Sequence, residues 1–256
     1  MSDTAIIVEN LAMSYEGHVI QRDLNFEVNR NEIFVIMGNS GSGKSTLMRT
    51  MTGLDEPDCG DIMYHCYSEQ DFKSFWKSPE QMRHKMMEQF GVMFQNGALF
   101  SSMTLLENVS LRLTETTHYS AERIRKIASL KLALVGLKGY EKYYPSEISG
   151  GMKKRVGIAR AMAMDPPILF FDEPSAGLDP LSSKQLDDLL LELRNSMGIT
   201  MIVVTHELDS IFSIADNSIF LDHDQQTIIA KGDPKDMLKE NSHYQVQAFL
   251  SRGKEI

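Results

Sequence analysis

The sequence has no long hydrophobic run, and this absence limits its relation to a membrane. Its longest apolar stretches, among them Ile33–Met37 and Met201–Val204, are far shorter than the roughly 20 residues that a membrane-spanning helix needs. Ala5–Val8, near the start, has neither the preceding basic region nor the length of a secretory signal. We therefore expect a chain that stays in the cytoplasm and does not cross a bilayer itself.

Cysteine is scarce, and positive charge is not in excess. Cys59 and Cys66 are separated by six residues, a spacing that matches no common metal site, so we interpret both as incidental thiols. The formal net charge is −9 and the sequence pI is near 5.3, which argues against a nucleic-acid partner and against direct adhesion to anionic lipid. The basic clusters Arg123–Lys126 and Lys153–Arg155 lie in helical patterns, and we interpret them as solvated faces.

The hydrophobic pattern indicates an α/β fold. Ile20–Val28 alternates apolar residues with polar ones such as Gln21, which predicts a half-exposed strand in a small antiparallel sheet. Later apolar runs lack this alternation and are typical of parallel strands buried on both faces: Phe34–Ile36, Ile168–Phe171, Ile202–Val204 and Ile219–Leu221. Helical patterns such as Leu181–Arg194 lie between them. The predicted class is α/β, with a mainly parallel central sheet and a small antiparallel part near the N-terminus.

Residues 95–157 carry helical patterns and few strand signals, with helices predicted at Ala121–Val135 and Gly151–Met164. The tail, Asp233–Arg252, predicts one or two further helices. A chain of 256 residues that is 42% apolar can bury a sizeable core. We therefore expect one domain over residues 1–256, in which 1–94 and 158–256 form a core and 95–157 form an inserted helical subdomain.

A glycine-rich segment follows the apolar run at Ile33–Met37 and leads into a helical pattern from Thr46 onward. It is the complete P-loop pattern in its required strand–loop–helix context: Gly38, Asn39, Ser40, Gly41, Ser42, Gly43, Lys44 and Ser45. The glycines let backbone N–H groups approach phosphate oxygens, and the start of the helix adds positive partial charge. We expect Lys44 to reach the β- and γ-phosphates of ATP and Ser45 to bind Mg²⁺. The core is thus predicted to be a P-loop NTPase of the RecA-like type.

Polar side chains follow three further apolar runs. Because open α/β sheets bind ligands at the carboxyl ends of their strands, we expect these side chains near the P-loop. Asp172 and Glu173 end one run, where the first can hold Mg²⁺ and the second can act as general base toward water. His206 ends another and is placed to lie beside the γ-phosphate. Gln95 follows the third, where its amide oxygen can bind Mg²⁺ or orient water, although a lone histidine or glutamine carries little information.

A short motif upstream of Asp172 resembles the signature of the ABC ATPases: Ser149, Gly150, Gly151 and Met152, followed by Arg155. The resemblance covers nearly the whole chain and implies further roles. It makes Tyr15 the aromatic that stacks on adenine, Gln95 the Q-loop, and His206 the switch histidine. Asp179 then ends the D-loop, Ser175–Asp179. For Tyr15 alone, an ordinary exposed turn residue is the alternative.

In this family the signature loop serves the nucleotide held by the opposite subunit. The resemblance implies that Ser149 caps the helix that begins near Gly151, and that its hydroxyl and the Gly151 N–H complete the site of another chain. Each chain has one P-loop and one signature, so neither site is complete until two copies meet head to tail. We expect a homodimer that holds two ATP molecules, closes before hydrolysis and opens after it.

Met152 stands where the general family pattern has glutamine. Together with Val92–Phe100 and Thr104–Val109 it resembles the Mla-type ATPases of bacterial phospholipid trafficking, whereas Tyr64–Lys85 departs from that pattern. The resemblance implies an integral membrane permease, a lipid-binding Mce-type protein and peripheral attachment to the cytoplasmic face of the inner membrane. Ala98–Phe100, with Met103, is either a groove for the permease or ordinary packing between subdomains.

Three other functions compete with lipid transport. The chain can serve an ABC transporter for another small solute. A non-transport ABC ATPase is disfavoured by the single cassette, the acidic charge and the lack of a long coiled-coil insertion. A regulator that binds without hydrolysing is disfavoured because Lys44, Asp172, Glu173 and His206 are all present. The identity of the membrane partner and its cargo decides among them.

Overall fold

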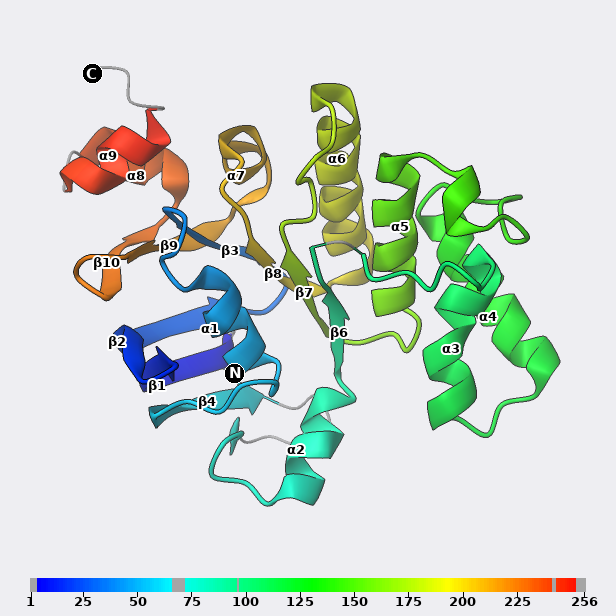
Figure 1. Cartoon of the computed structure of the whole chain (residues 1–256), viewed down its shortest axis with the longest axis horizontal. Helices are drawn as coiled ribbons and strands as arrows, with labels where there is room; N and C mark the ends of the chain where they lie inside the picture. The colour runs from blue at the N-terminus through cyan, green and yellow to red at the C-terminus, as the bar shows by residue number, and fades with distance from the viewer. Residues whose placement is uncertain (1–3, 66–71, 96, 241–242, 252–256) are drawn as a thin grey trace.

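Two β-sheets form the centre of the molecule (Figure 1). The computed structural model describes residues 4–65, 72–95, 97–240 and 243–251. The first sheet has the strand order β2-β1-β4-β5, and all its neighbouring strands are antiparallel. Its strands are β1 (Thr4–Tyr15), β2 (His18–Asn29), β4 (Cys59–His65) and β5 (Phe72–Ser74). The predicted antiparallel part near the N-terminus is therefore confirmed.

The second sheet has the order β10-β9-β3-β8-β7-β6 and is parallel except for β10 at one edge. Its strands are β3 (Ile33–Gly38), β6 (Phe90–Met93), β7 (Ile168–Asp172), β8 (Thr200–Val204), β9 (Asn217–Asp222) and β10 (Thr227–Gly232). Successive residues of β3 pack into different layers: Val35 joins the cluster under the helices, and Ile36 joins the cluster between the sheets. Burial on both faces explains why this strand needs apolar residues at every position.

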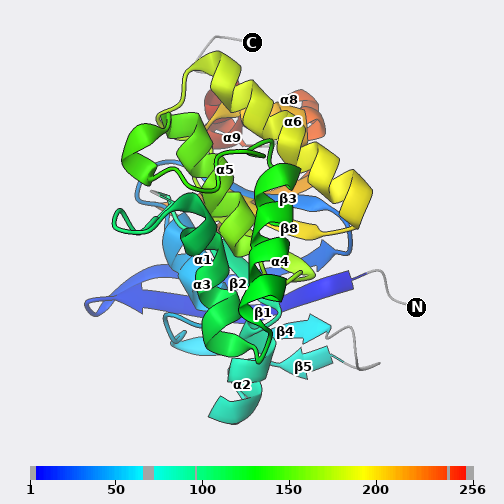
Figure 2. The same ribbon diagram turned by 90° about the vertical axis from the view of Figure 1, so that its right-hand side faces the viewer.

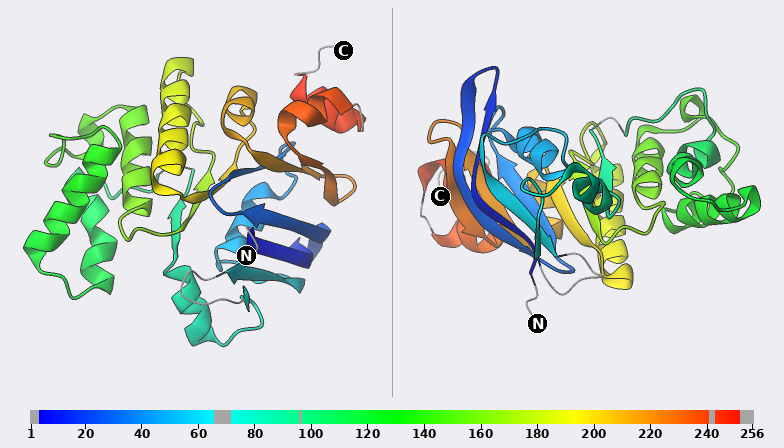
Figure 3. Two further views of the ribbon diagram at one scale, coloured as in Figure 1. Left: turned by 180° about the vertical axis from the view of Figure 1, so that it is seen from behind. Right: turned by 90° about the horizontal axis from the view of Figure 1, so that it is seen from below.

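Helices cover the sheets and extend to one side. Those of the sheet region are α1 (Lys44–Met51), α2 (Glu80–Met87), α6 (Pro180–Met197), α7 (Leu208–Ile214), α8 (Pro234–Glu240) and α9 (Tyr244–Leu250). The side extension holds α3 (Leu105–Thr116), α4 (Ala121–Leu134), the short η1 (Pro145–Glu147) and α5 (Gly150–Ala161). It faces the viewer in Figure 2, and in the view from below α3 and α4 stand away from the sheets (Figure 3). The predicted α/β class with a helical insertion is confirmed, whereas its division at residues 95 and 157 stays a prediction.

The polar side of β2 differs from the prediction at Gln21. The strict alternation of Ile20–Val28 predicted an exposed glutamine, but Gln21 is fully buried. Asp23 has φ +52°, and around it the pairing of β1 with β2 slips, so that Leu11 faces Leu24 while Met13 faces Gln21. A bulge of this kind exchanges the two faces of a strand.

The segment that departs from the Mla-type pattern is anchored to the core. Between Tyr64 and Lys85 the chain forms β5 and the start of α2, and Phe75 is buried with its ring edge-on to that of Tyr64. Asp61, itself buried, accepts hydrogen bonds from Ser74 and from the backbone of Trp76. Residues 66–71, with Cys66, lie outside the described residues. Among the described residues no helix is long and apolar enough to span a membrane.

Candidate functional site

The loop between β3 and α1 has a backbone that only glycine can form at its tightest points. Gly43 precedes α1 with φ +84°, and a Cβ at this position would lie 2.5 Å from Ile20 Cγ2. At Gly38 a Cβ would lie 2.3 Å from the carbonyl oxygen of Leu221 on β9. The loop therefore wraps tightly around the start of α1, and its backbone is open to a ligand.

Two polar side chains hold this loop in shape. The buried Gln21 donates to the carbonyls of Ser42 at 2.8 Å and of Asp222 at 2.9 Å, so that β2 and β9 brace the loop from behind. Lys44 Nζ donates to the carbonyls of Gly38 and Asn39, each at 2.9 Å. Burial lowers the pKa of Lys44, and the carboxylates of Glu173 and Asp172 oppose this effect. The ammonium group is thus held over the loop by groups that favour its charged form.

The carboxylates at the end of β7 face the loop. Ser45 Oγ donates to Asp172 Oδ1 at 3.2 Å, and burial raises the pKa of Asp172 while Ser45 and Lys44 lower it. Glu173 Oε1 lies 2.7 Å from His206 Nδ1, at the end of β8. Glu173 Oε2 is buried and has no hydrogen-bond partner among the residues that the structure describes. One carboxylate oxygen is therefore fixed by the histidine, and the other is left to accept a proton or a hydrogen bond from a ligand.

A cavity of about 590 Å³ brings these groups together, within the volume range of small-molecule sites. Most of the predicted site residues line it: Gly38, Asn39, Ser40, Gly41, Gly43, Lys44, Ser45, Thr46, Gln95, Glu173 and His206. Two of the predicted residues adjoin the cavity without lining it. Ser42 is buried under the loop, and Asp172 reaches the site through Ser45.

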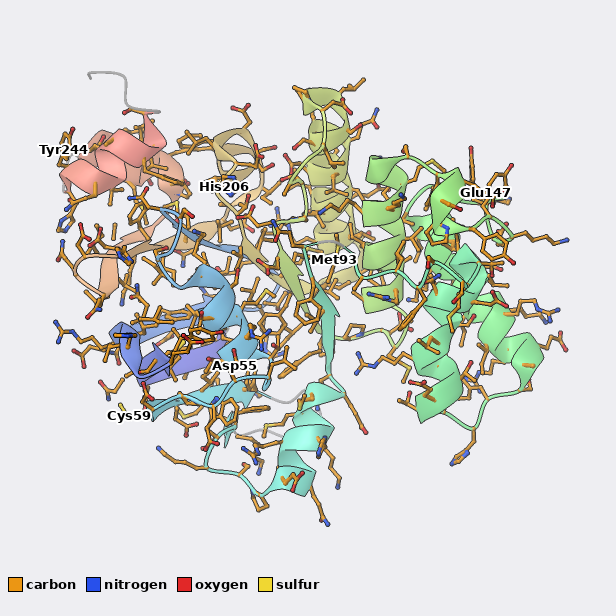
Figure 4. The ribbon with its side chains drawn as sticks, viewed as in Figure 1. Asp55, Cys59, Met93, Glu147, His206 and Tyr244 are labelled. Atoms are coloured by element: carbon orange, nitrogen blue, oxygen red, sulfur yellow. The ribbon has the colours of Figure 1, made fainter. Side chains whose placement is uncertain are left out.

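Five further predicted site residues are also absent from the lining of this cavity. Tyr15 is the last residue of β1, before the turn into β2, and is 64% exposed. Ser149 caps α5 by accepting a hydrogen bond from Met152 N at 3.3 Å, with Gly150 and Gly151 in the first turn. Asp179 caps α6. In Figure 4, Glu147, just before the signature, lies far from His206.

Three residues of the site region were not predicted. Ile20 and Phe249 line the cavity from β2 and α9, and their sequence context carries no signal for this role. Lys154, in a cluster that we interpreted as a solvated face, is only 9% exposed and donates to the carbonyls of Gln95 and of Glu173. That interpretation is wrong for Lys154, because its side chain lies on the inward face of α5. Burial lowers the pKa of Lys154, and Glu173 and Asp172 oppose the effect.

A second buried polar group ties the predicted D-loop to the segment after His206. Asp187 of α6 accepts a hydrogen bond from Ser210 Oγ of α7 at 2.9 Å, and this hydroxyl lies 3.5 Å from Ser175 Oγ. All three residues are buried. Burial raises the pKa of Asp187 to about 6, and the nearby acids Asp188, Glu207 and Asp209 add to the rise.

We expect Asp187→Asn to stabilise the protein above pH 6. Because folding raises the pKa of Asp187 from 3.8 to about 6, its contribution to stability is greatest in acid and falls as the pH rises through this window. Above it the buried carboxylate costs on the order of 3 kcal/mol, and the amide removes that cost while still accepting from Ser210. Thermal unfolding at pH 7.5 and pH 4 measures the difference, which should shrink in acid. Glu192→Gln, at an exposed position of the same helix, is the control, and an equal gain there would contradict the assignment.

The geometry agrees with comparisons to known proteins. The family model described as ABC transporter matches residues 21–176. The intermembrane phospholipid transport system ATP-binding protein MlaF of Haemophilus influenzae is 35% identical over 96% of this chain and 90% of its own length. The glycine betaine transport ATP-binding protein OpuAA of Bacillus subtilis is 41% identical, over 88% of this chain but 52% of its own length.

The fold is also similar to that of a solved ATP-binding cassette. The ATP-binding cassette MJ0796, described as a dimer in a post-hydrolysis state bound to ADP and Pi, superposes with a TM-score of 0.77 and 28% sequence identity, over 89% of this chain and 98% of its own. The P-loop cavity, the carboxylate pair and the matched family together lead to one conclusion: the chain belongs to the ABC transporter family, as an ATP-binding and ATP-hydrolysing subunit.

Proposed function

We propose that two copies of this chain enclose two Mg²⁺–ATP molecules and use their hydrolysis to drive a separate membrane permease that moves phospholipid. One observation supports the dimer above all others. The signature residues Ser149–Gly151 stand at a well-formed helix start, yet they do not line the cavity of their own P-loop. In Figure 1 α1 and α5 stand apart, with strands β7 and β8 between them in that view. The dimeric cassette MJ0796 is the relevant precedent.

The polar groups of the site suit a magnesium–nucleotide complex. Ser45 and Asp172 offer oxygen atoms 3.2 Å apart beside the P-loop, and hydroxyl and carboxylate oxygens are ligands that Mg²⁺ prefers. We assign Ser45, Asp172 and Gln95 as the residues that hold the ion together with phosphate oxygens. When bound, Mg²⁺ neutralises charge that develops on the phosphates. Tyr15, exposed at the end of β1, is assigned to stack on the adenine.

The chain's own residues supply the remaining parts of phosphoryl transfer. Lys44 and the loop N–H groups bind the terminal phosphates, which positions the reacting group and stabilises its charge. Glu173 Oε2 accepts the proton of the attacking water, because that oxygen is buried and has no partner among the described residues. His206 fixes the other oxygen at 2.7 Å, so the carboxylate cannot rotate freely. Asp179, at the cap of α6, remains assigned to the dimer contact.

Phospholipid is the proposed cargo because MlaF, matched over nearly the whole chain, carries that activity in its name. A Mce-type lipid-binding protein is then the expected accessory partner, and the chain is expected to sit at the cytoplasmic face of the inner membrane. Glycine betaine is the second candidate because OpuAA has the higher identity, although the chain spans only 52% of it. Within the segment Ala98–Phe100, we assign the exposed Phe100 as a permease contact, whereas Leu99 packs on the core.

Co-purification tests the partner and the cargo together. We expect the tagged chain, extracted from its native membranes in mild detergent, to retain an integral membrane protein, and we expect the complex to hydrolyse ATP faster with phospholipid than with glycine betaine. Phe100→Ser should abolish retention without changing ATP binding. Tyr244→Ser, at an 84% exposed tyrosine on α9 (Figure 4), is the matched control. Stimulation by glycine betaine alone would replace the lipid with the solute, and retention of ribosomes or DNA would exclude transport.

A further inference from the structure

We propose that Lys154 is a positioning residue for hydrolysis, which joins the signature helix to the backbone of both Gln95 and Glu173. The inference rests on the roles proposed above for Gln95 and Glu173. It adds a residue outside the predicted site, and it gives α5 a direct contact with the backbone of the catalytic glutamate. The signature end of the same helix is the part assigned to the partner's nucleotide.

The contacts of Lys154 are unusual for a lysine on a helix. Its ammonium group is buried and donates to the carbonyl of Gln95, in the Q-loop, and to that of Glu173 at 3.1 Å. Among the described residues it forms no ion pair with an acid, and both of its hydrogen bonds go to main-chain carbonyls. A charged donor makes hydrogen bonds that are roughly twice as strong as neutral ones. The cation is therefore placed to fix backbone rather than to neutralise a partner.

Glu173 has a backbone that requires such support. Its φ is +48°, in the left-handed region that costs a residue with a side chain about 1–2 kcal/mol. The N–H of Glu173 donates to Val204 on β8 at 2.8 Å, and its carbonyl accepts from Ala176 at 3.2 Å as well as from Lys154. This conformation turns the side chain back toward His206 and the P-loop cavity. Removing the ammonium group frees one side of a strained turn that aims the general base.

Comparison with Arg160 distinguishes the effects of the two contacts of Lys154. Arg160 lies on the same helix and donates to the carbonyls of Gly97 at 2.7 Å and Ala98 at 2.6 Å, just beyond Gln95. Arg160 therefore holds the Q-loop without touching Glu173. If Q-loop anchoring alone were the function of Lys154, loss of either cation would have a similar effect. If Glu173 is the target, loss of Lys154 has the larger effect on the chemical step.

Steady-state kinetics of the purified chain test the proposal. We expect Lys154→Met to lower kcat about 10- to 100-fold, the scale of a misplaced catalytic group, while KM for ATP changes less than about threefold. Lys154→Arg, which keeps a donor, should recover a large part of kcat, and Arg160→Met should lower kcat less than Lys154→Met. Lys153→Met is the control, because it removes the same charge one position away without contact to Glu173.

The outcomes separate the inference from the function on which it rests. Normal turnover in Lys154→Met, together with loss of turnover in Glu173→Gln, would overturn the role of Lys154 and leave the proposed mechanism intact. Normal turnover in Glu173→Gln would overturn the mechanism itself. Loss of nucleotide binding or a lowered melting temperature in both Lys154 variants would make Lys154 a stabilising residue only, and would also overturn the proposal.

Discussion

Glu173→Gln is expected to lower the rate of ATP hydrolysis about 10²- to 10⁴-fold, the usual contribution of a general base, while leaving ATP affinity nearly unchanged. The amide keeps the size of the carboxylate and can still pair with His206, whose ring nitrogen lies 2.7 Å from Oε1. It cannot take up the proton of water. ATP favours the closed pair of chains, and hydrolysis allows the two chains to separate. The variant should therefore also accumulate as a stable dimer in the presence of ATP.

Two measurements check this expectation. Single-turnover hydrolysis reports the chemical step, and size-exclusion chromatography with ATP and with ADP reports the dimer. Glu192→Gln, at an exposed position of α6, is the matched control and should hydrolyse at the normal rate. Normal hydrolysis by Glu173→Gln would remove the glutamate from the mechanism, and a monomer in ATP would argue against the closed dimer.

Two inactive variants are expected to recover activity when they are mixed before ATP is added. Lys44→Met removes the phosphate contact of the P-loop, and Gly151→Asp places a negative charge at the signature. The helix tolerates the second change, because a Cβ at Gly151 meets Ser182 at an ordinary distance of 3.6 Å. In a mixed dimer, one of the two sites combines the intact P-loop of the Gly151→Asp chain with the intact signature of the Lys44→Met chain. The other site is defective in both halves. With random pairing about a quarter of the sites are complete, so we expect up to about a quarter of normal activity.

A second mixture is the control for this experiment. Lys44→Met and Glu173→Gln both damage the P-loop half of a site, so every site of their mixed dimer is defective. That mixture should stay inactive. Recovery in both mixtures, or in neither, would contradict a site shared between the two chains. The measurement is steady ATP hydrolysis at a fixed total protein concentration and varied mixing ratio, which should peak near equal amounts.

Several elements of the fold follow from local pattern. Unbroken apolar runs predicted the parallel strands because both faces of that sheet are covered, and Ser149 was correctly predicted to cap α5. The pattern failed at Gln21, where the bulge at Asp23 exchanged the faces of β2. It also failed at Lys154, whose environment depends on strands that are distant in sequence.

The sequence by itself determined the phosphate loop, the order of the ABC motifs and the α/β class, because each depends on residues within one short segment or on a repeating pattern of burial. The tertiary structure alone decided which of these residues share a cavity, that Glu173 is held in a left-handed turn by Lys154, and that Asp187 is buried with a pKa of about 6. The physical reason is that hydrogen bonds and desolvation depend on neighbours brought together by folding. The local sequence around a residue does not identify those neighbours.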